Sequence, residues 1–437
     1  MKIVLLFSSL LLMMMAGCGS NGKNGLNGTN GTNGSSGLNS ASIPVLSPVA
    51  FDNAGVILAW SQPYGVTSYK IYSATTSGGP FSAIGTTTTT HYLVKDLTPG
   101  TTYYFVVTSV LGSEESSYSN TVSFRPYVMY TYRVGSSPHG IAIDASGNVW
   151  VANEGDNTVS KISSTTSTPQ TTTIAVGTAP FGVAIDHIGN VWVTNRNSIS
   201  EISGNVATTP TTGFSRAVAI AIDQTGNLWV SDYSTSLLTE LDPSGAVQRV
   251  FPVCSSPQPV GIDALGNIWV GSWGGGVISE VTTQFTGYTY YAGNESMGLA
   301  IDQSGNIWAS DYGTYDVYEI TSTTGTPVTS TVISSMISPA GIAIDASGNI
   351  WIVDYSNNNV TEFSPDGILL ETYTVGGSPV GIAIDASGNV WVTNTGDGTV
   401  RELFGAAQGP QYFPCQYSTA SGNTCPQFQG GGNWSWP

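Results

Sequence analysis

Acidic residues recur in the sequence at spacings that could bind a metal ion. The motif apolar–Asp–x–x–Gly–Asn–apolar–Trp occurs seven times, beginning with Asp144 and ending with Asp385. Its first copy, residues 144–148, places side-chain oxygens at every second position, as calcium loops do. It lacks the later glycine and glutamate of such loops. Seven equivalent copies favour a structural hairpin, in which Asp accepts backbone N–H groups and Gly takes a positive φ. We therefore predict no metal site and no cofactor.

General acid–base chemistry needs an ionisable side chain with a positioned partner. The histidines are His91, His139 and His187. His91 lies in a Thr-rich connection and His187 in a hairpin turn, so both are expected at the surface. Only His139, just before a predicted inner strand, could line an opening, and the sequence shows no paired ionisable group for it. The sequence contains no recognisable Ser/His/Asp set, Cys/His pair, phosphate loop or zinc-ligand spacing. We therefore favour a protein without catalytic residues.

A second set of carboxylates lies on the predicted strand that follows each motif. Six of the seven repeats hold a glutamate at this position and the first holds a lysine, so we interpret the position as structural. We expect these carboxylates to accept hydrogen bonds between neighbouring blades. The residues are Lys161, Glu201, Glu240, Glu280, Glu319, Glu362 and Glu402.

The motifs recur about every 40 residues, and this period predicts one blade of a β-propeller for each copy. Only 9% of the residues are charged, and Gly, Ser, Thr and Asn are abundant, as in turn-rich β proteins. We predict an all-β chain in which each motif places one large ring between neighbouring sheets. The tryptophans are Trp150, Trp192, Trp229, Trp269, Trp308, Trp351 and Trp391.

Each repeat divides into four short strands, which in the first repeat lie at 140–144, 148–153, 158–163 and 171–176. The seventh repeat ends after a third strand. Residues 127–134, upstream of the first repeat, closely resemble the fourth strand that begins near residue 371. We predict that this upstream segment completes the last blade and closes a seven-bladed propeller over residues 127–404, because closure removes an exposed sheet edge.

The repeated pattern Pro-x-Gly-Ile-Ala-Ile-Asp-x-x-Gly-Asn-Val-Trp-Val resembles the NHL-type propellers and their relative, the streptogramin B (virginiamycin B) lyase. The resemblance implies the propeller fold for residues 127–404. That family includes enzymes, sensors and binding scaffolds, so the fold does not decide the function. A lyase-like enzyme would imply a histidine base and magnesium-binding carboxylates at the propeller mouth, where this chain offers only His139.

The N-terminal residues have the character of a bacterial export signal. Lys2 precedes an apolar run that is too short to span a membrane as a helix. Ala16-Gly17-Cys18 resembles a lipobox, which implies removal of residues 1–17 and lipidation of Cys18. Residues 18–42 repeat Asn-Gly and Ser-Gly units with few apolar side chains and are expected to form a flexible tether. No Asp follows the cysteine to retain the protein at the inner membrane, so we expect an outer-membrane or cell-surface location.

Residues 43–126 show the two-residue alternation of a β-sandwich, for example at Val56, Leu58 and Trp60. Residues 97–103, Leu-Thr-Pro-Gly-Thr-Thr-Tyr, resemble the tyrosine corner of fibronectin type III domains, whose hydroxyl bonds to the upstream backbone. Trp60 matches the buried tryptophan of that family. The resemblance implies an N-terminal fibronectin type III-like β-sandwich, which we expect to act as a spacer.

Two cysteines lie in a tail rich in Gly, Gln and Pro, residues 405–437. Because an exported protein meets an oxidising compartment, we predict a disulfide between Cys415 and Cys425. Cys254 is then the unpaired cysteine, and its role stays open.

An aromatic residue follows the second strand in four consecutive blades, the third to the sixth. Propeller connectivity places these aromatic residues on the same face as His139. Aromatic rings beside carboxylates suit stacking on a sugar or anchoring a peptide. Alternatively, the rings pack only against neighbouring loops. The aromatic residues are Tyr233, Trp273, Tyr312 and Tyr355, and the aspartates that precede three of them are Asp232, Asp311 and Asp354.

The formal net charge is −17, with only 11 Lys and Arg residues. Nucleic acid is excluded as a partner, because phosphate binding needs a basic face. We expect a lipid-anchored extracytoplasmic protein whose propeller binds a protein or a glycan without catalysis. Two alternatives stay open: a lyase-like enzyme that uses the propeller mouth, and a purely structural surface protein.

The lipobox resemblance predicts that the mature protein partitions with membranes and begins at Cys18 with a lipid mass on that residue. Mass spectrometry of the N-terminal peptide from a membrane fraction measures both. A soluble chain that begins at another residue would contradict the prediction.

Overall fold

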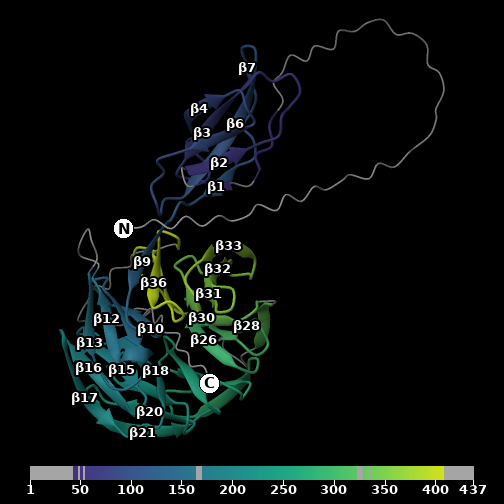
Figure 1. Cartoon of the computed structure of the whole chain (residues 1–437). Helices are drawn as coiled ribbons and strands as arrows, with labels where there is room; N and C mark the ends of the chain where they lie inside the picture. The colour runs from purple at the N-terminus through teal and green to yellow at the C-terminus, as the bar shows by residue number, and fades with distance from the viewer. Residues whose placement is uncertain are drawn as a thin grey trace, which may run out of the picture.

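The computed structural model describes residues 43–407, apart from residues 48–49, 53–54, 164–169, 322–327 and 335. Within these residues the chain forms β-strands and one short 3-10 helix, η1 (Glu154–Asp156), and no α-helix. The described part therefore holds no helix long and apolar enough to cross a membrane. Two bodies of antiparallel sheet follow one another, a small sandwich and a larger ring (Figure 1). The predicted all-β class is confirmed.

The sandwich consists of two sheets. The first contains β1 (Ala50–Asp52), β2 (Gly55–Ala59) and β5 (His91–Val94). The second contains β4 (Ser82–Thr87), β3 (Ser68–Ala74), β6 (Tyr103–Leu111), β7 (Glu114–Glu115) and β8 (Val122–Phe124).

The core of the sandwich uses the residues that the alternation indicated. Val56 and Leu58 of β2 are fully buried against the facing sheet. Trp60 is also buried and meets the edge of Tyr69, with ring centroids 5.2 Å apart. The Thr98 N–H donates to the Tyr103 hydroxyl at 3.1 Å. This bond is the predicted tyrosine corner.

The ring consists of seven four-stranded sheets, here called blades 1 to 7. Blade 1 contains β10 (Pro138–Ile143), β11 (Val149–Asn153), β12 (Thr158–Ile162) and β13 (Thr171–Ala175). Blade 2 contains β14 (Pro180–Ile185), β15 (Val191–Asn195), β16 (Ser198–Ser203) and β17 (Val206–Thr212). Blade 3 contains β18 (Ala217–Ile222), β19 (Leu228–Asp232), β20 (Leu237–Leu241) and β21 (Val247–Pro252). Blade 4 contains β22 (Pro257–Ile262), β23 (Ile268–Ser272), β24 (Val277–Val281) and β25 (Gly287–Tyr291).

The remaining blades repeat this order. Blade 5 contains β26 (Ser296–Ile301), β27 (Ile307–Asp311), β28 (Asp316–Ile320) and β29 (Thr329–Ile333). Blade 6 contains β30 (Pro339–Ile344), β31 (Ile350–Asp354), β32 (Asn359–Phe363) and β33 (Leu369–Thr374). Blade 7 contains β34 (Pro379–Ile384), β35 (Val390–Asn394), β36 (Thr399–Phe404) and the upstream strand β9 (Val128–Arg133).

The strand β9 closes the ring. It pairs antiparallel with β36, so that Arg133 lies opposite Thr399 and Met129 opposite Leu403. The Tyr132 hydroxyl also donates to the Glu402 carboxylate at 2.5 Å. The predicted closure of the last blade by residues upstream of the first repeat is confirmed.

Each repeated aspartate organises the turn between the first and second strands of its blade. In blade 1, one carboxylate oxygen of Asp144 accepts the Ser146 and Asn148 N–H groups at 3.0 and 2.8 Å, and the other accepts the indole N–H of Trp150 at 3.0 Å. The bond from indole to carboxylate recurs in all seven blades, at 3.0 to 3.3 Å. Gly147 has a φ of 78°, which a residue with a Cβ rarely adopts. The hairpin interpretation of the motif is confirmed.

The oriented tryptophans fill the spaces between blades. Trp192 of blade 2 packs against Ile220 and Val230 of blade 3. Trp391 of blade 7 packs against Ile141 of blade 1 in the same way, so the ring closes through its core as well as through β9.

Buried hydroxyls also link successive blades. The Thr194 hydroxyl donates to the Val218 carbonyl of the next blade at 2.6 Å. The Ser231 hydroxyl likewise donates to the Gln258 carbonyl of the next blade at 2.8 Å. Thr393 donates to the His139 carbonyl at 2.8 Å, which joins blade 7 to blade 1.

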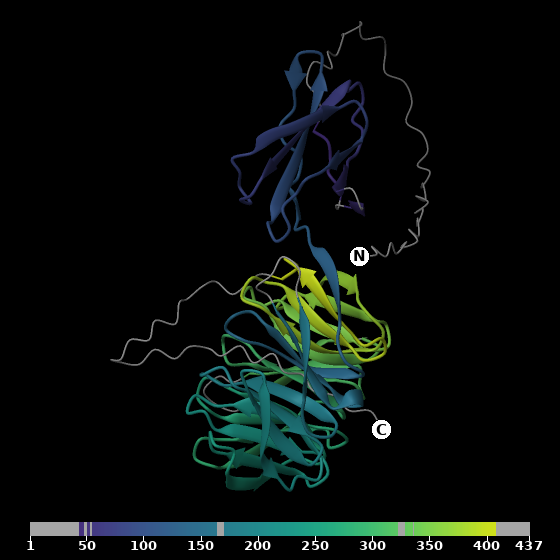
Figure 2. The same cartoon turned by 60° about the vertical axis from the view of Figure 1, so that its left-hand side comes forward.

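The sandwich lies beside blades 6 and 7 (Figure 2), and its contact with blade 7 is at the end that carries the Asp–Gly turn. The Gly405 N–H donates at 2.8 Å to the side chain of Asn389, which belongs to the turn of blade 7. Gly405 also lies so close to the sandwich that an added Cβ would collide with the Gly100 backbone. The inner strands begin on the opposite face, which we call the mouth face.

Deleting residues 127–134 should destabilise the whole propeller, because the loss exposes the edge of β36 and removes the bond between Tyr132 and Glu402. Thermal unfolding followed by far-ultraviolet circular dichroism measures the change. A melting temperature equal to that of the intact chain would contradict the closure role of β9.

Candidate functional site

The mouth face has a mostly apolar floor. The second residue of each inner strand lies at the centre of the ring and is buried, and most of these residues pack in one cluster. Figure 1 shows the inner strands β10, β18, β26 and β30 around this centre. The seven floor residues are His139, Phe181, Val218, Gln258, Met297, Ala340 and Val380.

The four predicted aromatic residues lie on this floor, and each ring is half-buried against it. Trp273 and Tyr312 stack at a centroid distance of 5.9 Å with their planes 24° apart. The Arg216 guanidinium lies over the Tyr233 ring, 4.6 Å from its centroid. The rings therefore pack as the alternative interpretation expected, yet part of each stays accessible on the mouth face.

The three aspartates beside these rings anchor loops, a role that the sequence did not predict. Asp232, Asp311 and Asp354 are at most 3% exposed. Asp232 accepts the Ser215 N–H at 2.7 Å. Asp311 accepts the Glu295 N–H at 2.6 Å, and Asp354 accepts the Ile337 N–H at 3.3 Å. Because these carboxylates already fix the loops before the inner strands, we leave them out of the binding surface.

His139 has an ionisable partner, which the sequence analysis missed. Its Nε2 lies 2.9 Å from a carboxylate oxygen of Glu154, the residue in blade 1 that corresponds to Tyr233. The hydrogen bond from His139 lowers the pKa of the Glu154 carboxyl, and the charges of Arg216 and Arg196 lower it further. The strand pairing holds a signal for this contact. Asn153 pairs with Pro138, so Glu154, directly after Asn153, lies near His139, directly after Pro138.

The imidazole is poorly placed to act as a general base. Its side chain is only 6% exposed and stacks on Phe181 at a centroid distance of 4.5 Å. Nε2 faces Glu154, and the buried Nδ1 has no hydrogen-bond partner among the described residues. A base must reach the proton that it removes, so this geometry suits a structural role at the floor.

Four of the six third-strand glutamates bond to the fourth strand of their own blade, not to a neighbouring blade as predicted. Glu240 pairs with Arg249 at 2.8 Å, and Glu280 accepts the Tyr290 hydroxyl at 2.7 Å. Glu402 accepts from Tyr132 of β9.

Two of these carboxyl groups titrate near neutrality. Burial raises the pKa of Glu362 to about 7, and the neighbouring Asp345 carboxylate adds to the shift. Burial likewise raises the pKa of Glu402 to about 7, against the hydrogen bond from Tyr132.

The predicted lipidation site and disulfide, Cys18 and the pair Cys415–Cys425, lie outside the described residues. Cys254 is buried between blades 3 and 4, and its thiol donates to the Val270 carbonyl at 3.6 Å. Burial raises the pKa of this thiol. Within the described part of the chain, no three His, Cys, Asp or Glu side chains are grouped to hold a metal ion.

Comparison with protein families finds a match in each of the two parts of the chain. Residues 50–125 match the fibronectin type III domain, and residues 136–162 and 337–363 match the NHL repeat. A comparison with curated proteins found no match.

Solved structures share the propeller fold. Virginiamycin B lyase from Staphylococcus aureus is 17% identical over 64% of this chain and 99% of its own, with a TM-score of 0.57. A catalytically inactive form of that enzyme with quinupristin gives a TM-score of 0.58 at 17% identity, over 64% of this chain and 99% of its own. A streptogramin B lyase structure gives a TM-score of 0.58 at 17% identity, over 63% of this chain and 97% of its own. These likenesses establish the fold.

Replacing Glu402 by Gln should reduce the loss of stability at high pH. The folded-state pKa of about 7 lies above the ordinary value of 4.5, so the folded chain holds this proton more tightly and stability falls as the pH rises through that interval. Gln mimics the protonated form. From pH 5 to pH 8 the free energy of unfolding of the native chain should fall by about 1–3 kcal/mol more than that of the variant.

Chemical denaturation at both pH values measures this difference. Glu114→Gln is the control, because Glu114 is an exposed residue on β7 of the sandwich. Equal pH dependence in the Glu402 variant and the native chain would contradict the raised pKa.

Proposed function

We propose that the mouth face is a non-catalytic binding surface for a glycan. The observation that carries this proposal is the arc of four half-buried rings on consecutive blades, Tyr233, Trp273, Tyr312 and Tyr355. Rings that are fixed from below by an apolar floor lose little side-chain freedom when a ligand binds. They offer flat faces to the sugar rings of an extended chain.

The surroundings of the arc add polar groups without a reactive centre. Arg216 lies over one end of the arc, and Arg196 is exposed on the neighbouring loop of blade 2. Side chains of this kind can donate hydrogen bonds to sugar hydroxyls. His139 is closed off between Glu154 and Phe181, which is why we propose binding and not lyase chemistry.

The proposed location agrees with this orientation. We propose that a lipid on Cys18 and the tether hold the protein on the outer surface of a bacterial envelope. The sandwich joins the propeller at the turn face. A chain anchored through the sandwich would then present its mouth face away from the membrane, where an extracellular glycan is accessible.

The aromatic arc is tested by replacing Trp273 and Tyr312 separately by Ala. Full-length protein is first applied to a glycan array, and the strongest ligand is then titrated by calorimetry. Each substitution should weaken binding by about 1–3 kcal/mol if the ring is an anchor. Tyr288→Ala is the control, because this 52% exposed ring lies on β25 at the outer rim of blade 4.

Unchanged affinity in both arc variants, with melting temperatures preserved, would place the ligand elsewhere. Failure to bind any glycan on the array would overturn the choice of ligand. Magnesium-dependent linearisation of a streptogramin B by the native chain would favour the lyase alternative, and we expect no such activity.

A further inference from the structure

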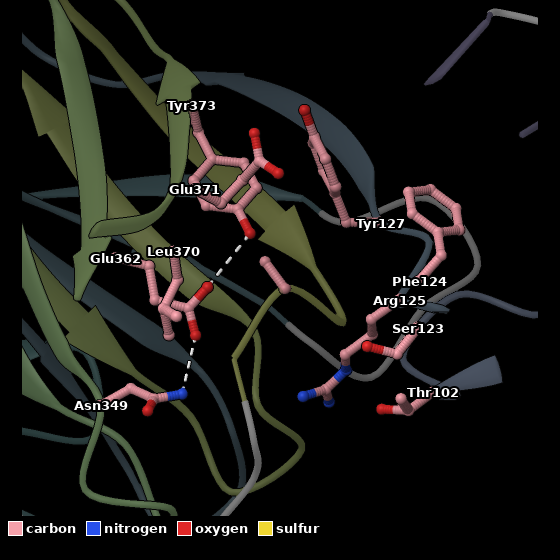
Figure 3. A pocket seen from close by; sticks show the side chains of 11 residues that line it. Thr102, Ser123, Phe124, Arg125, Tyr127, Asn349, Glu362, Leu370, Glu371 and Tyr373 are labelled. Carbon is pink, nitrogen blue, oxygen red and sulfur yellow. Dashed lines mark hydrogen bonds between the residues drawn. The ribbon is translucent and has the colours of Figure 1, made fainter. Parts of the chain in front are cut away.

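A cavity of about 290 Å³ lies between the sandwich and blade 6, away from the mouth face. The sandwich side contributes Thr102, Ser123 and Phe124, and the chain that leaves it contributes Arg125 and Tyr127. Residues of blade 6 form most of the opposite wall (Figure 3). Ligand sites are common at domain interfaces, and this volume is at the small end of their range. The blade 6 residues are Asn349, Glu362, Leu370, Glu371 and Tyr373.

Opposite charges face one another across this cavity without touching. The guanidinium of Arg125 is directed from the sandwich side towards Glu362 and Asn349 (Figure 3). Each charge affects the titration of the other, yet no ion pair joins Arg125 to a carboxylate in the described part of the chain. The Arg125 Nε donates to the Gly100 carbonyl at 3.1 Å, which fixes the side chain. Its two terminal nitrogens make no hydrogen bond to a described residue and stay available to an anion.

The carboxylate wall is equally well fixed. Asn349 donates to Glu362 at 2.8 Å, and the Tyr373 hydroxyl donates to its other oxygen at 3.4 Å. A carboxylate has about four lone-pair positions, so both oxygens can still accept from a ligand. Tyr127 meets Tyr373 edge to face at a centroid distance of 4.9 Å, and Glu371 lines the same side.

A fixed cation and a fixed anion on opposite walls select a ligand that carries both charges. A neutral molecule, or one with a single charge, would leave at least one wall without a charge-assisted bond. We propose that the cavity binds a small zwitterion of the α-amino-acid class, with its carboxylate on the terminal nitrogens of Arg125 and its ammonium group on Glu362. Because the two walls belong to different domains, the bound ligand stabilises their relative arrangement.

The ligand series that tests this proposal uses the native full-length chain. L-leucine carries both charges, isocaproate lacks the ammonium group and isoamylamine lacks the carboxylate, while the hydrocarbon part is the same. Calorimetric titration should give a Kd for leucine at least about tenfold lower than for either analogue. Leucine should also raise the melting temperature, since it binds the folded state. Equal binding of all three compounds, or no binding of leucine at roughly 10 mM, would overturn the proposal.

The dependence on pH gives an independent readout. The charged and titratable groups around Glu362 are Asp345, Tyr373, Glu371 and Arg125. Burial, together with the Asp345 carboxylate, raises the pKa of Glu362 to about 7 against the lowering effects of Asn349, Tyr373 and Arg125. Ionised Glu362 is the form that binds an ammonium group. Leucine should therefore bind about tenfold more tightly at pH 8 than at pH 6.

Matched variants assign the contacts. Arg125→Gln and Glu362→Gln should each weaken leucine binding about tenfold, and the Glu362 variant should lose the pH dependence. Glu319→Gln changes the same strand position in blade 5, outside the cavity, and should bind leucine as the native chain does. Full affinity in both cavity variants would overturn the assignment. Melting temperatures, measured without ligand, separate a loss of binding from a loss of folding.

Discussion

The hydrogen bond from each motif tryptophan to its aspartate is the interaction on which the propeller depends. One carboxylate closes the turn through backbone N–H groups, and the same carboxylate accepts the indole N–H. The turn and the orientation of the largest core side chain are thus set by a single residue. The indole of the tryptophan then packs against the following blade, as that of Trp192 does on Ile220. Local turn chemistry is in this way coupled to contacts between sheets, and the coupling is repeated in all seven blades.

The repeated framework leaves two places where the blades differ. At the mouth, the residue after each second strand is free to vary, and four successive blades use an aromatic ring there. At the turn face, blade 6 meets the sandwich, and Glu362, in addition to its bonds inside the blade, lines a cavity opposite Arg125. The two proposed sites lie on opposite faces, so a surface-displayed binding face and a domain-coupling site can coexist on one propeller.

The candidate site was only partly predictable from the sequence. The arc of Tyr233, Trp273, Tyr312 and Tyr355 followed from repeat position alone, because propeller connectivity assigns each position to a face. The role of the adjacent aspartates as loop anchors was not predicted, since their pattern does not reveal that the loop entering the inner strand bends back onto them. In the structure Asp311 accepts the Glu295 N–H. The partner of His139 was missed for a similar reason. Glu154 is fifteen residues away in sequence, and strand pairing brings it to the imidazole.

The sequence by itself determined the all-β class, the seven blades, the closure by residues upstream of the first repeat and the tyrosine corner. These features depend on short motifs whose spacing is read directly along the chain, as in the bond between Thr98 and Tyr103. The tertiary structure alone decided which polar groups form hydrogen bonds within the protein and which can still bind a ligand. Glu362 and Arg125 are far apart in sequence and belong to different domains, and only the packing of the sandwich on blade 6 makes them face one another. Burial and distance set the chemistry of a carboxylate, and neither is encoded in the local pattern around it.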